Sequence, residues 1–154
     1  MEVTLVRATI DDAPIIWQMQ ITAFAGLLST YQDFDTNPGN EPLEKVQSRF
    51  AMPSTHFYFI RVGGVNAGAI RVVDARDGSP KRISPLFVLP EFRGRGVAQA
   101  AIRQAERIHG DTDWTLGTIL QEKANCHLYE RMGYRPTGDT KIINDRMTLV
   151  FYAK

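Results

Sequence analysis

The sequence of 154 residues contains one cysteine, three histidines and no long apolar run. Cys126 alone cannot form an intramolecular disulfide or a multi-thiolate zinc site, and the scattered histidines lack metal-ligand spacing. We therefore expect no metal centre and a reducing, cytoplasmic setting. No segment approaches the roughly 20 apolar residues that cross a bilayer, and residues 1–7 lack the apolar core of a signal peptide. Both observations argue against secretion and membrane insertion.

An excess of charge of one sign is also missing. Lys and Arg number 18 against 17 Asp and Glu, so the formal net charge is +1. A nearly neutral molecule has no overall field that would draw it to nucleic acid or to an anionic membrane, and any polyanion site has to be local. With 44% hydrophobic residues, the chain can bury a real core, and its length fits one domain over residues 1–154.

The residue patterns predict a mixed α/β (α+β) fold with the order β-α-α-β-β-β-α-β-α-β-β. Strands are expected at residues 3–8, 56–62, 65–73, 82–89, 114–120, 134–143 and 146–152. Helices are expected from a cap at residues 9–12 to about residue 24, and over residues 43–52, 97–109 and 122–132. Gly68 inside a strand predicts a bulge or a close approach, and Pro85 predicts a local distortion because it removes a ladder donor.

The turn between the strand at 82–89 and the helix at 97–109 has the composition of an anion site. It reads Arg93-Gly94-Arg95-Gly96-Val97-Ala98. A helix N-terminus presents unpaired N–H groups, glycines allow close approach, and arginines add cationic donors. A Walker loop would need Gly-Lys-Ser/Thr, and a dinucleotide fingerprint would need Gly or Ala where Gln99 stands, so neither nucleotide motif fits. Taken alone, the turn is also consistent with a tight connection.

Two motifs in the right order make the interpretation more specific. The turn, preceded by Val88-Leu89-Pro90-Glu91, resembles the acyl-CoA-binding motif Arg/Gln-x-x-Gly-x-Gly/Ala of the GCN5-related N-acetyltransferases. The segment Leu128-Tyr129-Glu130-Arg131-Met132-Gly133-Tyr134 resembles the second motif of that family. The element order is similar to the family fold over essentially the whole chain, a mixed, mostly antiparallel sheet flanked by helices.

The resemblance implies acetyl-CoA as the cofactor and assigns residues to it. The main-chain amides of the turn would hold the coenzyme A diphosphate, the strand end would pair with the pantetheine arm, and Asn125 would contact the same arm. Tyr129 would face the thioester sulfur, and the Val88 N–H would donate to the oxyanion. The implied cofactor-binding residues are Phe87, Val88, Leu89, Arg93, Gly94, Arg95, Gly96, Val97, Ala98 and Asn125.

The chemistry of amide formation is compatible with these assignments. An amine that attacks a thioester needs fixed N–H donors, an acid near the sulfur and a route for the amine proton. The unperturbed pKa of tyrosine, about 10, lies above the ~8.5 of a thiol, so Tyr129 can donate a proton to the leaving sulfur. Glu122 is a candidate proton acceptor, although an acid at a helix N-terminus is also an ordinary dipole partner. Cys126 is interpreted as a packed small residue and not as a nucleophile.

The acceptor is expected to be a primary amine of a small molecule or peptide, attacked directly in a ternary complex as in the resembled family. Residues 29–44 are expected to form a loop that carries Asp33, Asp35, Glu41 and Glu44 but no Lys or Arg. In the resembled family the first helices and the loop after them wall the acceptor side, and here that region offers Trp17, Phe24, Tyr31 and Phe34. Acids beside aromatic residues suit a cationic amine, and a solvated loop with its aromatics in the core is an equally good interpretation.

Three functions of different classes remain at this stage. The favoured one is an acetyl-CoA-dependent N-acetyltransferase, and the second is a non-catalytic acyl-CoA-binding or sensing module. The third is a nucleic-acid-binding protein that uses the arginines at 93, 95, 103 and 107, which the near-neutral charge disfavours. We expect neither a nucleic-acid nor a membrane partner. Because many members of the resembled family dimerise, a homodimer is considered beside the monomer.

Overall fold

A computed structural model describes residues 2–154, and within them seven strands form one sheet in the order β1-β2-β3-β4-β5-β7-β6. The strands are β1 (Val3–Arg7), β2 (Thr55–Val62), β3 (Val65–Val73), β4 (Lys81–Val88), β5 (Trp114–Ile119), β6 (Arg135–Ile142) and β7 (Thr148–Ala153). The helices are α1 (Ala13–Tyr31), α2 (Leu43–Phe50), α3 (Val97–His109) and α4 (Lys123–Arg131), with short 3-10 turns η1 (Ile10–Asp12), η2 (Pro38–Asn40) and η3 (Pro90–Phe92). Among these strands of the described chain, only β4 and β5 pair in parallel. The expected element order and mostly antiparallel sheet are confirmed.

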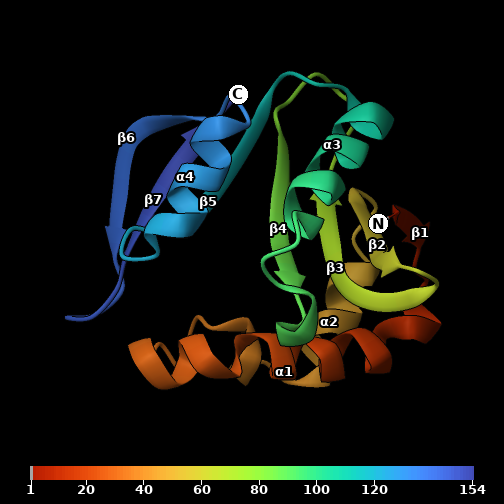
Figure 1. Cartoon of the computed structure of the whole chain (residues 1–154), viewed down its shortest axis with the longest axis horizontal. Coiled ribbons are helices and arrows are strands. Elements are labelled where there is room, and N and C mark those ends of the chain that lie inside the picture. The colour runs from red at the N-terminus through yellow and green to blue at the C-terminus, as the bar shows by residue number, and fades with distance from the viewer. Residues whose placement is uncertain (1) are drawn as a thin grey trace.

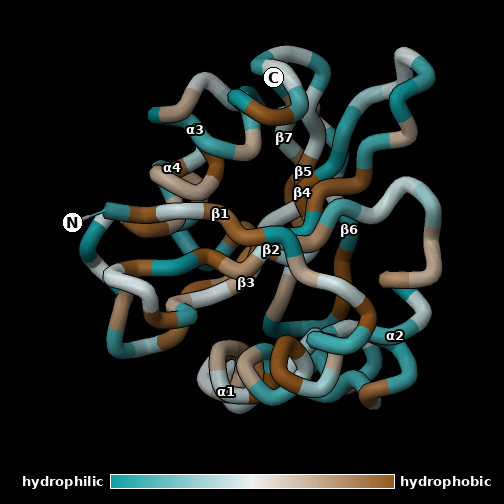
Figure 2. Tube along the Cα trace, turned by 90° about the vertical axis from the view of Figure 1, so that its right-hand side faces the viewer, coloured by the Kyte–Doolittle hydropathy of each residue, from teal (hydrophilic) through white to brown (hydrophobic). Residues whose placement is uncertain are grey.

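The sheet buries a separate core on each face because side chains alternate along its strands. On β2, Tyr58 and Ile60 belong to the core under α3 and α4, whereas Phe57 and Phe59 belong to the core under α1 and α2. Figure 2 shows hydrophobic segments gathered along the inner strands and more hydrophilic outer loops. The two cores hold the helices on both sides of the strands that end near the turn before α3.

Helix α1 is longer than the sequence indicated, continuing through Gly26 to Tyr31. Ala23, Leu27 and Tyr31 are four residues apart, so they lie on the same face of the helix, and the Tyr31 side chain is buried. An interior glycine costs a helix roughly 1 kcal/mol relative to alanine, whereas burial of a large side chain contributes about 2 kcal/mol. Packing at the far end of the helix therefore outweighs the glycine that was expected to end it.

Strands β4 and β5 run together for only a short distance. Their pairing is confined to Lys81 with Trp114 and Arg82 with Thr115, and β5 then pairs with β7 over Thr115 to Ile119. Figure 1 shows the two strands diverging toward α1. One edge of β4 is consequently free of strand partners from Ile83 to Val88.

Both irregularities predicted from the sequence are present where β4 pairs with β3. The register of β3 against β4 shifts between Ile70 and Val72, opposite the cis Ser84–Pro85 peptide. Gly68 lies directly against β4, because a Cβ placed there would lie 2.1 Å from the Phe87 carbonyl oxygen. The missing side chain lets the strand end at Phe87 and Val88 lie close to β3.

Within residues 2–154 the structure has no helix that is both long enough and apolar enough to cross a membrane.

Candidate functional site

A cleft of about 840 Å³ lies where β4 and β5 diverge, between α1, the turn before α3, and α4. This volume falls in the range of small-molecule sites, about 300–1,000 Å³. The cleft brings together most of the residues predicted from the sequence: Phe87, Val88, Arg93, Gly94, Gly96, Val97, Ala98, Glu122, Asn125 and Tyr129. Leu89 and Arg95 are not among the lining residues.

The turn before α3 presents a run of unpaired main-chain N–H groups to this cleft. The Arg93 N–H donates to Pro90 O in a 3-10 turn, and the next main-chain N–H with a main-chain acceptor is that of Ala100, which donates to Gly96 O. The run therefore spans residues 94–99. The expected stretch was residues 93–98, so the observed run is displaced by one residue toward the helix. Successive N–H groups of this kind, at a helix N-terminus, form a concave anion site.

Two glycines make the shape of this run attainable. Gly94 has φ +76° and Gly96, which caps α3, has φ +74°. Residues with a Cβ rarely adopt such angles, whereas glycine does so without steric cost. The Gly-Arg-Gly sequence is therefore used for backbone geometry as well as for close approach.

Val88 turns its N–H toward the space between β4 and β5. The Leu89 N–H donates to Ala67 O, so the Leu89 amide is directed toward β3. Because hydrogen-bonded and non-bonded pairs alternate in an antiparallel ladder, the Val88 amide, opposite Gly68, points away from β3. The Val88 N–H is thus available on the free edge of β4.

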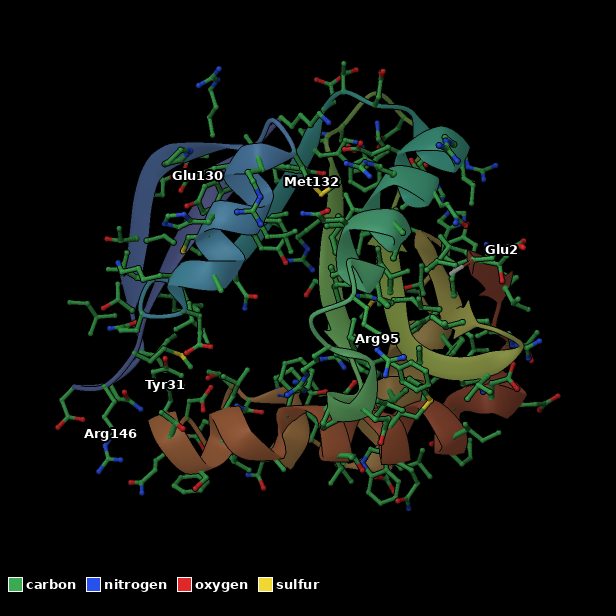
Figure 3. The ribbon with its side chains drawn as sticks, viewed as in Figure 1. Glu2, Tyr31, Arg95, Glu130, Met132 and Arg146 are labelled. Atoms are coloured by element: carbon green, nitrogen blue, oxygen red, sulfur yellow. The ribbon has the colours of Figure 1, made fainter. Side chains whose placement is uncertain are left out.

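The two arginines of the turn differ in their contacts. Arg93 donates from Nε to Val88 O at 3.0 Å and from its second terminal nitrogen to Ala23 O at 2.7 Å. Its side chain therefore ties the turn to β4 and α1. Arg95, labelled in Figure 3, is exposed, and its guanidinium lies 5.8 Å from the centroid of the Phe92 ring. The Arg95 guanidinium forms no hydrogen bond or ion pair with the described residues, so it is available to a bound anion.

Tyr129 and Asn125 lie on successive turns of α4 and both line the cleft. Burial, with a smaller contribution from Cys126, raises the pKa of Tyr129 to about 12. The hydroxyl is therefore protonated at neutral pH, and it donates no hydrogen bond to another residue of the described chain. Cys126 itself is buried in the core, with its thiol toward the Ile119 carbonyl at 3.6 Å.

Glu122 precedes α4 and contacts Tyr31, one of the aromatic residues expected on the acceptor side. The Tyr31 hydroxyl donates to Glu122 Oε2 at 2.5 Å, across 91 positions of sequence. Burial, and then the hydrogen bond and charge of Glu122, raise the pKa of Tyr31 to about 12. Figure 3 shows Tyr31 between the end of α1 and the first turn of α4. Among the residues that line the cleft, only Glu122 carries a carboxylate.

The acidic residues at 29–44 are largely engaged elsewhere. Glu41 forms a bidentate ion pair with Arg49, with nitrogen–oxygen distances of 2.5 and 2.7 Å. Asp33 is buried and accepts a hydrogen bond from the Asn37 side chain. None of the acids in this stretch lines the cleft. A part of the stretch also belongs to α1 and not to a loop, because the helix continues to Tyr31.

Helix α1 forms one wall of the cleft, with Ala23, Phe24, Gly26, Leu27 and Thr30. Of the four aromatic residues expected on the acceptor side, Phe24 is the one that lines the cleft. The sequence analysis did not predict that the helix continues beyond residue 24. The only signal was the four-residue spacing from Ala23 through Leu27 to Tyr31, which Gly26 concealed.

A family model described as the acetyltransferase (GNAT) family matches residues 24–134. The chain belongs to the GNAT acetyltransferase family. The match covers both the turn before α3 and the Tyr129 region of α4. Among curated proteins, none is significantly similar to this GNAT acetyltransferase in sequence.

Solved structures share the fold of this GNAT protein at low sequence identity. The PaiA N-acetyltransferase of Thermoplasma acidophilum, in complex with coenzyme A, has a TM-score of 0.76 and 13% identity, with 100% of each chain covered. The spermidine N-acetyltransferase of Vibrio cholerae, in complex with CoA and spermine, has a TM-score of 0.75 and 16% identity, covering 97% of this chain and 93% of that one. An acetyltransferase of Thermus thermophilus has a TM-score of 0.72 and 17% identity, covering 99% and 96%. Family membership and the coenzyme A complexes support acetyl-CoA as the cosubstrate.

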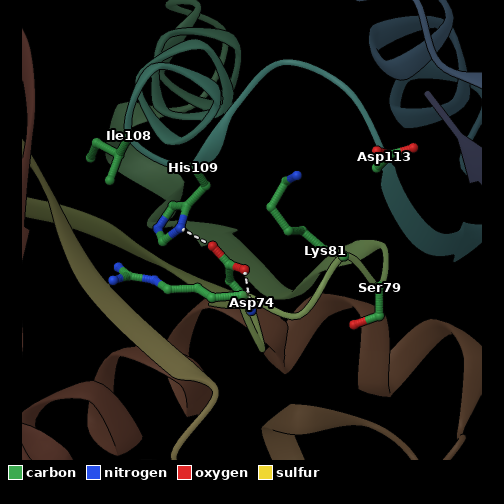
Figure 4. A pocket seen from close by; sticks show the side chains of 8 residues that line it. Asp74, Ser79, Lys81, Ile108, His109 and Asp113 are labelled. Atoms are coloured by element: carbon green, nitrogen blue, oxygen red, sulfur yellow. Dashed lines mark hydrogen bonds and ion pairs between the residues drawn. The ribbon is translucent and has the colours of Figure 1, made fainter.

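A second polar pocket, of about 450 Å³, lies at the opposite end of α3 and is lined by His109, Asp74 and Lys81, among others (Figure 4). His109 bonds Asp74 Oδ2 through Nδ1 at 2.7 Å and the Tyr58 hydroxyl through Nε2 at 2.9 Å. His56 packs edge-on against His109. These contacts fix the C-terminal end of α3 to the sheet in this GNAT protein, away from the cleft.

His56 makes stability sensitive to acid. Its Nδ1 accepts from Arg7 at 2.9 Å, so the neutral ring is required, and burial followed by the charge of Arg7 lowers its pKa from 6.5. The folded protein therefore binds fewer protons than the unfolded chain below about pH 6.5, and stability is full above this pH and lost as the pH falls toward the folded pKa. Urea unfolding at about pH 7.5 and about pH 5.5 should show a larger acid loss in the wild-type protein than in His56→Gln. Equal losses in the two proteins would contradict this role.

Proposed function

We propose that the protein transfers an acetyl group from acetyl-CoA to a primary amine of a small molecule or peptide, by direct attack in a ternary complex. The observation that carries the proposal is a single cleft lined by both an unpaired N–H run at residues 94–99 and the protonated Tyr129 hydroxyl. An anion cradle and an acid in one cavity suit a reaction that binds a diphosphate and expels a thiolate.

In this proposal four polar groups of the cleft have separate tasks. Acetyl-CoA supplies the thioester, and the N–H groups of residues 94–99 would bind its diphosphate. The Val88 N–H stabilises the negative charge that develops on the carbonyl oxygen. A cationic acceptor first releases one proton to water and becomes the neutral amine. The nitrogen–carbon bond then forms and the carbon–sulfur bond breaks; Glu122 takes the second proton that the nitrogen loses, and Tyr129 gives a proton to the sulfur. Exchange with water returns both residues to their starting states.

A primary amine is proposed as the acceptor for two reasons. The one carboxylate of the cleft, Glu122, attracts a cationic group and can accept a proton. The similar structure from Vibrio cholerae contains the amine spermine.

The function can be tested with a panel of acceptors. Acetyl-CoA should raise the melting temperature of the protein by mass action, and thiol release should require a primary amine. Turnover with neutral or anionic acceptors alone would overturn the proposed acceptor class. Binding of acetyl-CoA without thiol release for any acceptor would favour the non-catalytic acyl-CoA-binding module instead.

Arg95 and Arg93 should respond differently to substitution. Arg95→Gln removes a free cation near the cradle and is expected to raise the Kd for coenzyme A about tenfold, while its melting temperature stays unchanged. Arg93→Gln removes the bonds to Val88 O and Ala23 O, so its main effect should be a lower melting temperature. Calorimetric titration and thermal unfolding of both variants check the prediction. The opposite pattern, with Arg93 controlling affinity and Arg95 controlling stability, would contradict it.

A further inference from the structure

The contact between Tyr31 and Glu122 lies at the acceptor side of the proposed reaction. Tyr31 ends α1 and Glu122 caps α4, so the hydrogen bond joins the two walls of the cleft. Oε2 accepts from Tyr31, whereas Oε1 has no hydrogen-bond partner among residues 2–154. The carboxylate is therefore held by one oxygen and is free at the other.

The position of Tyr31 depends on the turn between β6 and β7. Asn144 Nδ2 donates to Tyr31 O at 2.9 Å, and Arg146 donates to Thr30 O at 3.2 Å. Asn144 is itself fixed, because its Oδ1 accepts from the N–H groups of Arg146 and Met147. These contacts bond the last carbonyls of α1, which have no intrahelical partner. Figure 3 shows Arg146 beside the same end of α1 as Tyr31.

Other ionisable groups lie on the elements next to Glu122. Tyr31 approaches from α1, the guanidinium of Arg146 in the β6–β7 turn is directed to a carbonyl of α1, and Arg131 of α4 lines the same cleft. On α4, Lys123 follows Glu122 directly, Cys126 directs its thiol to the end of β5, and Tyr129 faces the cleft. No arginine or lysine forms an ion pair with Glu122 in the described chain, since the salt bridges there join other residues. The Tyr31 hydroxyl is thus its main stabilising partner.

We propose that Tyr31 is a positioning residue for acetyl transfer: its hydroxyl holds one carboxylate oxygen of Glu122, so that the second oxygen is turned to receive the proton of the acceptor amine. The inference rests on the proposed function, in which Glu122 is the proton acceptor. A hydrogen bond to one carboxylate oxygen restricts the rotation of the side chain and leaves the other oxygen available as an acceptor. Because Tyr31 keeps its own proton at neutral pH, it acts only as a donor.

The test compares Tyr31→Phe with Tyr152→Phe. Tyr152 donates to Glu130 Oε2 at 2.7 Å, so the control removes a similar tyrosine–glutamate bond on the same helix. Glu130 lies at the other end of α4, as Figure 3 shows, and does not line the cleft. The first readout is the carbon-13 NMR chemical shift of the Glu122 carboxyl group at neutral pH, with its signal assigned from Glu122→Gln. The second readout is kcat and the KM for acetyl-CoA with the best amine of the panel.

Tyr31→Phe is expected to move the carboxyl signal of Glu122 and to lower kcat about tenfold with little change in the KM for acetyl-CoA. Tyr152→Phe should leave the Glu122 signal unchanged. An unmoved Glu122 signal in Tyr31→Phe would overturn the proposal, as would a moved signal with an unchanged kcat. Absence of turnover in the wild-type protein would count against the proposed function alone, and the NMR signal would still decide whether Tyr31 holds Glu122.

Discussion

Replacing Tyr129 by phenylalanine is expected to lower kcat for acetyl transfer about 100-fold, with the KM for acetyl-CoA changed by less than about threefold. The substitution keeps the ring that packs beside Tyr134 and Tyr152 and removes only the hydroxyl that faces the cleft. Loss of a proton donor to the sulfur affects the breaking bond and not cofactor binding. Steady-state thiol release with saturating amine measures both constants.

Tyr134→Phe is the matched control for this prediction. Its ring lies 6.1 Å from that of Tyr129, but its hydroxyl bonds Glu106 in the core and it does not line the cleft. The control should lose stability and retain most of kcat, because a buried carboxylate loses a donor. If Tyr129→Phe kept the wild-type kcat, another group would have to protonate the sulfur, and the role assigned to Tyr129 would be wrong.

Gly68→Ala is expected to lower the free energy of unfolding by roughly 3 kcal/mol, the upper end of the usual cost of overpacking. The new Cβ would lie 2.1 Å from Phe87 O and 3.0 Å from Val88 Cα, so β4 has to move away from β3. The shift would displace the Val88 N–H, and kcat should fall together with stability. Urea unfolding and thiol release measure the two effects.

Gly117→Ala tests whether any strand glycine would give the same result. A Cβ at Gly117 would meet the Phe151 ring at 3.0 Å, and a ring can rotate aside where a backbone cannot. Its cost should stay below about 1 kcal/mol. A Gly68→Ala protein as stable as the wild type would show that β3 and β4 are not held together at this point.

The backbone shape of the turn before α3 could be predicted from the sequence because its determinants are local. Gly94 and Gly96 set the backbone of one turn, and the helix that follows supplies the N–H groups regardless of distant contacts. Gly68 and Pro85 were informative for the same reason, since each restricts the backbone at its own position. Elements whose shape is determined within a few residues are the ones that sequence reasoning places well.

The contacts of the cleft walls could not be predicted because they join distant segments. Arg93 has the charge expected of a phosphate-binding residue. Only the fold shows that its guanidinium donates a hydrogen bond to the carbonyl of Ala23, 70 positions away. Tyr31 and Glu122 are separated by 91 positions, and α1 reaches Glu122 only because the helix passes through Gly26. Tertiary burial of Tyr31 overrode a local signal for helix termination.

The crystal structure of the protein with coenzyme A bound is the most direct test of the central claim. The diphosphate should lie against the main-chain N–H groups of residues 94–99, with the pantetheine arm passing the free edge of β4 at Val88 toward Tyr129. A diphosphate bound elsewhere, or a cleft left without coenzyme A at saturating concentration, would contradict the assignment of this turn as the cofactor cradle.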